Sequence, residues 1–304
     1  MKLFVAGMEI TQLASKITTS GSKSECARTL TAEILQPADG RGVPTVPLEI
    51  GLPVVFSADG QNFTGEVTGL SKSTNASTIT LTAKDLGYRL TLDANKVTTK
   101  ITKLTPQAAA AQLASSKGVP VGDLAACNTQ FSRKFADVKL YDAIMAGYIL
   151  DSEQTGKKYY LIMDGTNMCI RERGKVVATT IEAKVNLIVA SFSETINNKG
   201  ETERKGTIQN LGNAKCITGN AVKVVEPYTG MVGLFYIDSD THTWQNGIYT
   251  NKLTLAWENT MASTKAAGTA GGSGRSSGDS GSTDDGTALN TWIGPDGTIH
   301  KFGE

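Results

Sequence analysis

Short strand-like segments separated by turn signals fill residues 1–100, and this pattern constrains the fold more than any other feature of the sequence. Residues 78–83 alternate Ile79 and Leu81 with threonines, which is typical of a half-buried strand. Asp59-Gly60 stands between two further strand-like runs and predicts a hairpin. Five to seven strands without a long helix predict a small barrel or sandwich. Similar runs return at about 179–261, with Asn246-Gly247 near the final turn, so a second β domain is expected.

The segment between these two strand-rich parts has a different pattern. Thr105 can cap a helix whose first turn holds Pro106, and the alanine-rich run that follows has high helix propensity. A second helix is expected after Asp137, and Asp164-Gly165 predicts another hairpin. Two helices and a hairpin predict a small α+β domain between the two β domains.

The C-terminal part consists of a segment with almost no apolar side chains followed by a segment that contains several. Residues 263–286 are mainly Gly, Ser, Thr and Asp, and they cannot bury enough surface to offset their ordering entropy. This composition predicts a flexible linker. The last 18 residues, 287–304, form a short apolar peptide on that tether, which is suited to docking on a partner. The candidate partner-binding residues are Trp292, Ile293, Ile299 and Phe302.

Asp238, Asp240 and His242 alternate along one strand-like run, as metal ligands could. Along a straight strand, however, the first and last of these Cα atoms lie about 13 Å apart. Metal ligands must converge to within about 2.0–2.5 Å of one ion. The spacing therefore argues against a metal site and predicts a solvent-facing row opposite residues 235–237.

No other motif in the sequence proposes a catalytic or cofactor site. There is no GxSxG nucleophile motif, no P-loop and no dinucleotide fingerprint. The four cysteines form no CxxC pair, so the sequence predicts reduced, partly buried thiols rather than a zinc site. These are Cys26, Cys127, Cys169 and Cys216. We therefore expect no enzyme activity, no cofactor and no metal.

Charge and hydropathy exclude two further classes of protein. Lys and Arg total 30 against 29 Asp and Glu, without a dense basic block, which argues against binding nucleic acid through phosphates. No apolar run approaches the roughly 20 residues that span a bilayer, so membrane insertion is not expected. The N-terminus lacks the pattern of a signal peptide, which predicts synthesis in the cytoplasm.

Four phrases, in this order along the chain, carry a resemblance to a known family. They are "TLTAKDLGYRLTLDANK" (80–96), "KLYDAIMAGYILDSEQTGKKYYLIMDG" (139–165), "VNLIVASFSETINN" (185–198) and "TGMVGLFYIDSDTHTWQNGIYTNKLTLAWEN" (229–259). With the domain order, they resemble the baseplate hub proteins of contractile phage tails and R-type bacteriocins. These are the XkdQ-like or YqbQ-like relatives of the late-control D hub superfamily.

The resemblance implies a structural role in an assembled tail particle, a virion or bacteriocin baseplate. It implies two related, tube-like β-barrels, three copies of which form a homotrimeric ring of pseudo-sixfold symmetry. That ring joins the sixfold tail tube to the threefold spike and contacts other baseplate subunits. The competing prediction is a peptidoglycan-binding module or degraded cell-wall hydrolase, because "LTPQAAAAQLASSKGVPVGDL" resembles a LysM helix.

The expected fold class is mainly β, α+β overall, with two small β-barrel domains, an intervening α+β domain and a flexible C-terminal tail. The expected boundaries are 1–103 for the first barrel, 104–178 for the α+β domain, 179–262 for the second barrel, 263–286 for the linker and 287–304 for the docking peptide.

Overall fold

A computed structural model of the chain describes residues 1–36, 46–73, 77–196, 200, 202–262, 291–293 and 299–301. The chain divides into two compact units, Met1–Gly271 and Gly272–Glu304. The predicted linker, 263–286, lies outside the described residues. The second unit contributes two short antiparallel strands, β19 (Thr291–Ile293) and β20 (Ile299–Lys301).

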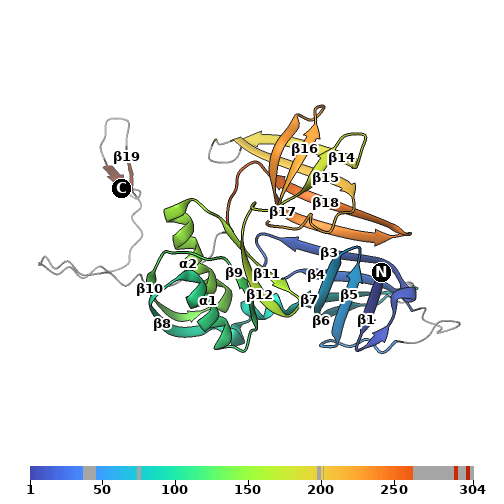
Figure 1. Cartoon of the computed structure of the whole chain (residues 1–304), viewed down its shortest axis with the longest axis horizontal. Coiled ribbons are helices and arrows are strands. Elements are labelled where there is room, and N and C mark those ends of the chain that lie inside the picture. Colours follow the sequence, from blue (N-terminus) through green and yellow to red (C-terminus); the bar gives the residue numbers. More distant parts are fainter. Residues whose placement is uncertain are drawn as a thin grey trace, which may run out of the picture. The chain divides into compact units, whose positions relative to one another are not determined.

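The first unit is mostly β, as predicted, and its largest element is one curled sheet of thirteen strands (Figure 1). Both strand-rich parts of the sequence contribute to it. We call strands β1–β7 the first β region: β1 (Lys2–Val5), β2 (Met8–Glu9), β3 (Ala14–Ser22), β4 (Thr29–Leu35), β5 (Pro53–Ala58), β6 (Gln61–Ser71) and β7 (Thr78–Asp85). We call β13–β18 the second β region: β13 (Val177–Glu182), β14 (Leu187–Ile196), β15 (Thr202–Leu211), β16 (Ala221–Glu226), β17 (Met231–Gln245) and β18 (Ile248–Ala256).

The predicted hairpins form because their turn residues tolerate left-handed backbone. Asp59 and Gly60 both have positive φ, 47° and 84°, between the paired strands β5 and β6. Asn246 and Gly247 do the same between β17 and β18. Two successive positive φ values match the right-handed twist of the strands on either side, so these turns fix the registers of both hairpins.

The middle region follows the first β region in the chain and contains both predicted helices. The first helix begins at Pro106 as expected, and Thr105 before it has extended backbone but makes no capping hydrogen bond through its side chain. The second helix ends where Gly156 adopts φ 78°. The elements of the middle region are two 3-10 turns (Leu86–Thr91 and Asp93–Asn95), β8 (Val97–Leu104), α1 (Pro106–Ser115), β9 (Val121–Leu124), β10 (Phe131–Val138), α2 (Leu140–Thr155), β11 (Tyr159–Asp164) and β12 (Asn167–Glu172).

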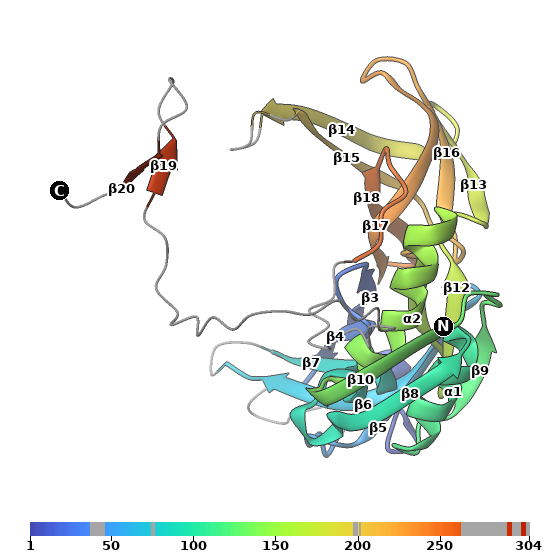
Figure 2. The same ribbon diagram turned by 90° about the vertical axis from the view of Figure 1, so that its left-hand side faces the viewer.

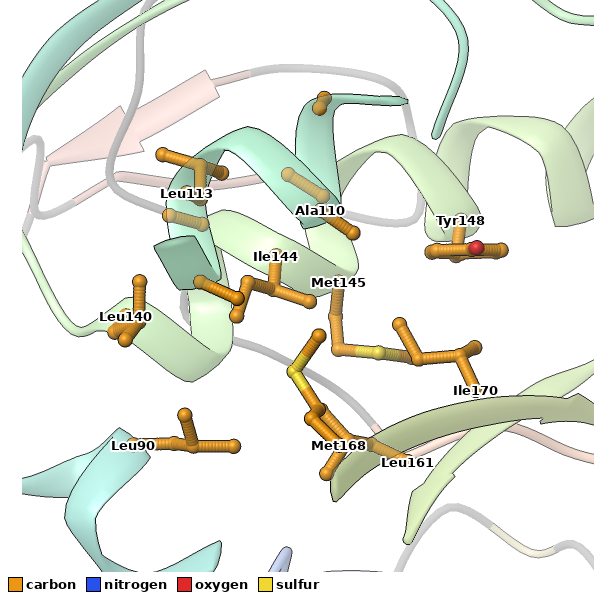
Figure 3. Packing of buried hydrophobic residues seen from close by; sticks show 14 of the residues in the cluster. Leu90, Ala110, Leu113, Leu140, Ile144, Met145, Tyr148, Leu161, Met168 and Ile170 are labelled. Atoms are coloured by element: carbon orange, nitrogen blue, oxygen red, sulfur yellow. The ribbon is translucent and has the colours of Figure 1, made fainter. Parts of the chain in front are cut away.

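Buried apolar side chains form three separate clusters, one for each region. The middle cluster packs α1 and α2 against β11 and β12, and Figure 3 shows Ile144 and Met145 of α2 above Met168 and Ile170 of β12. β8 contributes Ile101 to this middle cluster because it pairs with β10.

The two β regions are joined through a single long strand, β17. Its first half pairs with β16, and its second half, from Ser239 onward, pairs with β3 of the first β region. β3 and β17 lie side by side in Figure 1. A register shift between Ile237 and Ser239 marks a bulge where the strand passes from one region to the other. The last aromatic residue of β17, Trp244, therefore belongs to the core of the first β region.

Candidate functional site

Two of the three residues in the polar row on β17, Asp240 and His242, are buried, which corrects the predicted solvent-facing arrangement, while Asp238 is 20% exposed. Asp240 and His242 are 1% and 0% exposed. The reason is the bulge, because one extra residue in a strand exchanges the faces on which later side chains lie. Before it, Phe235 and Ile237 point into the core; after it, Asp240 and His242 do.

Asp240 is the centre of a hydrogen-bonded cluster that joins the two β regions. Arg28, the residue before β4, reaches it with both terminal nitrogens, and Nη1 lies 3.0 Å from Oδ1. Thr218 donates to the same Oδ1 from its backbone N–H (2.6 Å) and its hydroxyl (2.7 Å). Burial alone would raise the pKa of the Asp240 carboxyl, but Arg28 and His242 hold it well below its usual range. The carboxylate is thus ionised and fully paired at neutral pH.

The hydrogen bonds around His242 determine the role of its Nδ1 atom. The backbone N–H of Asn213 donates to Oδ1 of Asn251 (2.6 Å), which fixes the orientation of that amide. Nδ2 of Asn251 must then donate to Nδ1 of His242 (2.7 Å), beside the Tyr249 hydroxyl, also at 2.7 Å. Nδ1 is therefore the acceptor of this hydrogen bond, and the other ring nitrogen, Nε2, lies 3.2 Å from Oδ2 of Asp240.

This cluster has the residues of an acid–base dyad but not the accessibility of an active site. His242 and Asp240 are both buried, so a substrate cannot reach either of them. Cys216 lies near Asp240, and burial raises the pKa of its thiol to about 12, which leaves it protonated and unreactive. Among the described residues, no three His, Cys, Asp or Glu side chains are grouped to hold a metal ion. We therefore interpret the cluster as a structural joint.

A second ionic cluster ties the middle region to the same strand. Asp238 pairs with Lys23 (2.5 Å) at the end of β3 and with Arg173 just after β12. Lys23 also donates to the hydroxyl of Thr260 (3.1 Å), and the side-chain amide of Asn259 donates to the Arg173 carbonyl (3.0 Å). Residues from all three regions therefore meet around one carboxylate. We refer to the clusters of Asp238 and Asp240 together as the polar joint.

All four cysteines are buried and free, as the sequence predicted. Burial also raises the pKa of the Cys26 thiol to about 12. These cysteines contribute to packing, and the two most strongly shifted thiols are not nucleophiles at neutral pH.

The predicted partner-binding residues lie in the second compact unit. Trp292 and Ile293 are in β19 and Ile299 is in β20, with Ile293 opposite Ile299 in the ladder. Phe302 lies outside the described residues. Their role in binding a partner stays a prediction.

Sequence reasoning did not single out the exposed apolar residues of the second β region. Eleven of the eighteen exposed large apolar residues lie there, in under a third of the described chain. Such a concentration is typical of an interaction surface. They are Val177, Val185, Ile188, Val189, Phe192, Ile196, Leu211, Tyr228, Val232, Leu234 and Ile248.

Part of this surface is a two-stranded ribbon formed by residues 193–196 of β14 and 202–205 of β15, and Phe192 lies at its base. Figure 2 shows the ribbon projecting from the second β region. β14 ends the sheet, and β15 pairs with β18 only from Gly206 onward, so no described strand covers either edge of the ribbon. Phe192 packs against Trp257 with ring centroids 5.5 Å apart and is still 37% exposed. Ile196 is 76% exposed.

No helix in the described part of the chain is long and apolar enough to cross a membrane.

Comparisons with known proteins agree on one class. A family model described as YQBQ-like matches residues 17–202 and 196–256. The 43 kDa tail protein of prophage MuSo2 from Shewanella oneidensis has a similar fold, with a TM-score of 0.65 at 13% identity over 84% of this chain and 97% of that one. A tail protein of Neisseria meningitidis MC58 has a TM-score of 0.62 at 12% identity, over 84% and 95%.

A type VI secretion component of E. coli, c3393, which is described as similar to the T4 tail proteins gp27 and gp5, has a TM-score of 0.54 at 11% identity. That match covers 90% of this chain and 80% of the other. No curated protein matches the sequence.

Proposed function

The chain belongs to the YQBQ-like family, as its sequence resemblance predicted, and from this membership we propose that it is the structural hub of a contractile-tail baseplate. Its family membership and its fold similarity both support a general role as a structural protein of a tail. In the proposed assembly, three copies form a ring whose two β regions act as related barrels and alternate around a pseudo-sixfold axis. The ring joins the sixfold tail tube to the threefold spike inside the tail particle.

The observation that carries this proposal is the extent of the fold similarity. The match to the prophage tail protein covers 84% of this chain and 97% of the other, so it includes more than one region of the fold. The polar joint supports the same role, because a symmetry adaptor needs its two β regions held as one body. A buried ionic pair such as Arg28–Asp240, with Thr218 donating to the same carboxylate, holds such a geometry more strictly than apolar packing alone.

The exposed ribbon supports one element of this proposal, the self-association of the hub. A free strand edge with exposed apolar residues is a template for pairing with another chain, and an isolated two-stranded ribbon is marginally stable in water. A head-to-tail contact between copies closes into a ring when the rotation allows it. We therefore assign the ribbon to the contact between neighbouring hub subunits.

The double variant Phe192→Ser/Ile196→Thr should weaken trimer formation by about thirtyfold to several hundredfold, because each of the two lost apolar anchors costs roughly 1–2 kcal/mol of binding. The Ile196 replacement should hardly change the free energy of unfolding of the monomer, because that side chain is 76% exposed, whereas losing the contact of Phe192 with Trp257 should cost about 1 kcal/mol. Light scattering or mass photometry of the chain, alone and mixed with its spike, measures this directly.

The matched control is Ile50→Thr/Ile248→Thr, which removes similar apolar surface at residues 62% and 60% exposed outside the ribbon. Its assembly should equal that of the unmodified chain. Equal assembly of the ribbon variant and this control would assign the subunit contact to another surface.

The C-terminal peptide, 287–304, is proposed to attach the spike or a neighbouring baseplate subunit through Trp292, Ile293, Ile299 and Phe302. Deleting residues 287–304 should abolish or strongly reduce spike attachment. The mass of the hub ring should fall only by the mass of the deleted peptides. Co-purification with the spike checks both. Unchanged spike attachment by the truncated hub would refute this role.

The proposed role is structural and requires no catalysis. Two of the proteins with a similar fold are named simply as tail proteins, which favours a non-enzymatic function. The competing prediction of a peptidoglycan-binding module is separated by a pull-down on purified cell wall, to which a hub should not bind.

A further inference from the structure

A small cavity lies where the three regions of the first unit meet. Its walls include the end of β3 and the segment that follows it (residues 21–23 and 25–28), Tyr141 and Met145 of α2, the start of β11, and residues 260–262 after β18. The cavity volume is about 30 Å³, against roughly 10–15 Å³ for one water molecule on the same measure. It therefore has room for about two water molecules or one small ion.

Positive charge predominates around the buried part of this cavity. Lys23, Arg28 and Arg173 all line it. Arg28 is neutralised by Asp240, but Lys23 and Arg173 share the single carboxylate of Asp238. Glu25 also lines the cavity, yet it is exposed and takes part in none of the ion pairs between described residues. The pair of cations on Asp238 thus leaves one positive charge without a buried counter-charge.

Arg173 is also incompletely hydrogen-bonded. Its side chain is 1% exposed, and one terminal nitrogen binds Asp238. Its other two nitrogens, Nε and Nη1, are buried and have no hydrogen-bond partner among the described residues. Burial lowers the pKa of Arg173 even with Asp238 beside it, because the charge is only partly compensated. A buried guanidinium with two unpartnered donors is expensive, and native proteins normally satisfy such groups.

We propose that this cavity binds one small monovalent anion of the size of chloride, held by Arg173 and Lys23. The anion would accept from the free N–H groups of Arg173 and neutralise the surplus charge. The Thr260 hydroxyl accepts from Lys23, so its own hydrogen is free to donate to the ion. Bound there, the anion would connect side chains from the first β region, the middle region and the segment after β18. This site is independent of the proposed hub function.

Thermal unfolding of the full chain in sodium chloride against sodium gluconate, at equal sodium concentration, tests the proposal. Above the dissociation constant, chloride should raise the unfolding midpoint in proportion to the logarithm of its concentration, by about 5 °C at roughly a hundredfold excess over that constant, whereas gluconate is too large to enter. Bromide should reproduce the chloride effect. It should also give an anomalous-scattering peak beside Arg173 in crystals of the unmodified chain.

Two variants and one control isolate the site. Arg173→Met removes the surplus charge, leaves the Lys23–Asp238 pair intact and should abolish the chloride response; Lys23→Gln should weaken it. Arg171→Met is the control, because Arg171 lies two residues earlier, is partly exposed and pairs with Asp164 instead. It should respond to chloride like the unmodified chain.

A chloride response of equal size in Arg173→Met, or none in the unmodified chain, would overturn the site and leave water as the content of the cavity. If Arg173→Met fails to fold, the response of Lys23→Gln and the bromide peak decide the question. Absence of both the peak and the chloride-dependent rise of the unfolding midpoint would refute the proposal.

Discussion

Replacing Asp240 with alanine should lower the free energy of unfolding by about 3–5 kcal/mol. The substitution leaves Arg28 buried without its counter-charge and removes the acceptor of both Thr218 hydrogen bonds. The cost of an unpaired buried charge exceeds what the ion pair contributes over an apolar pair. Denaturant unfolding monitored by tryptophan fluorescence measures the loss.

Two comparisons make this result specific to the polar joint. Asp164→Ala breaks an exposed pair with Arg171, since Asp164 is 69% exposed, and should cost only about 0–1 kcal/mol. The double variant Arg28→Met/Asp240→Leu replaces both charges with apolar groups and should recover most of the stability lost in Asp240→Ala. A loss no larger than that of Asp164→Ala would contradict the structural role assigned to Asp240.

The same carboxylate should set the acid limit of stability. Because its folded pKa is held below the value of about 3.9 in an unfolded chain, its contribution is present above about pH 4 and is lost as the pH falls further. The contribution of Asp85 to stability changes with pH in the opposite direction. Burial raises its pKa to about 6, so its contribution is present below about pH 4 and is lost as the pH rises to about 6. Asp240→Asn should flatten only the acid limb.

Local features of this fold could be predicted from the sequence because neighbouring residues determine them. The Asp59-Gly60 and Asn246-Gly247 turns adopt positive φ wherever they stand in a strand pair, and the sequence placed both correctly. Pro106 begins a helix for an equally local reason, since its fixed φ suits a first turn.

The polar joint could not be predicted because it depends on a bulge and on a distant strand. Asp240 and His242 alternate with Ser239, Thr241 and Thr243, so both faces of this strand are polar and alternation does not identify the buried one. Its partner Arg28 stands 212 residues away in the chain. One signal in the sequence could have identified the buried face. Trp244 lies on the same face of the strand as Asp240 and His242, and large aromatic residues are highly buried on average.

Replacing Trp244 with alanine should cost about 3–5 kcal/mol and should loosen the connection between the two β regions. Trp244 belongs to β17, but its side chain fills the core of the first β region. It stacks on Tyr249 with ring centroids 4.6 Å apart, meets Phe56 edge-on at 4.9 Å, and donates from Nε1 to Asp59 (2.7 Å). Hydrogen exchange should therefore lose protection in both β3 and the second half of β17.

Trp244→Phe separates the contributions of packing and hydrogen bonding. It keeps an aromatic ring against Phe56 and Tyr249 and loses the hydrogen bond to Asp59, so it should cost less than the alanine variant. Trp257→Ala, at the half-buried edge of the second β region, is the regional control and should leave exchange in β3 unchanged. If hydrogen exchange in Trp244→Ala lost protection only in the turn at 246–247, β17 would not couple the two regions. A hub whose β regions unfold independently could not transmit a fixed geometry from tube to spike.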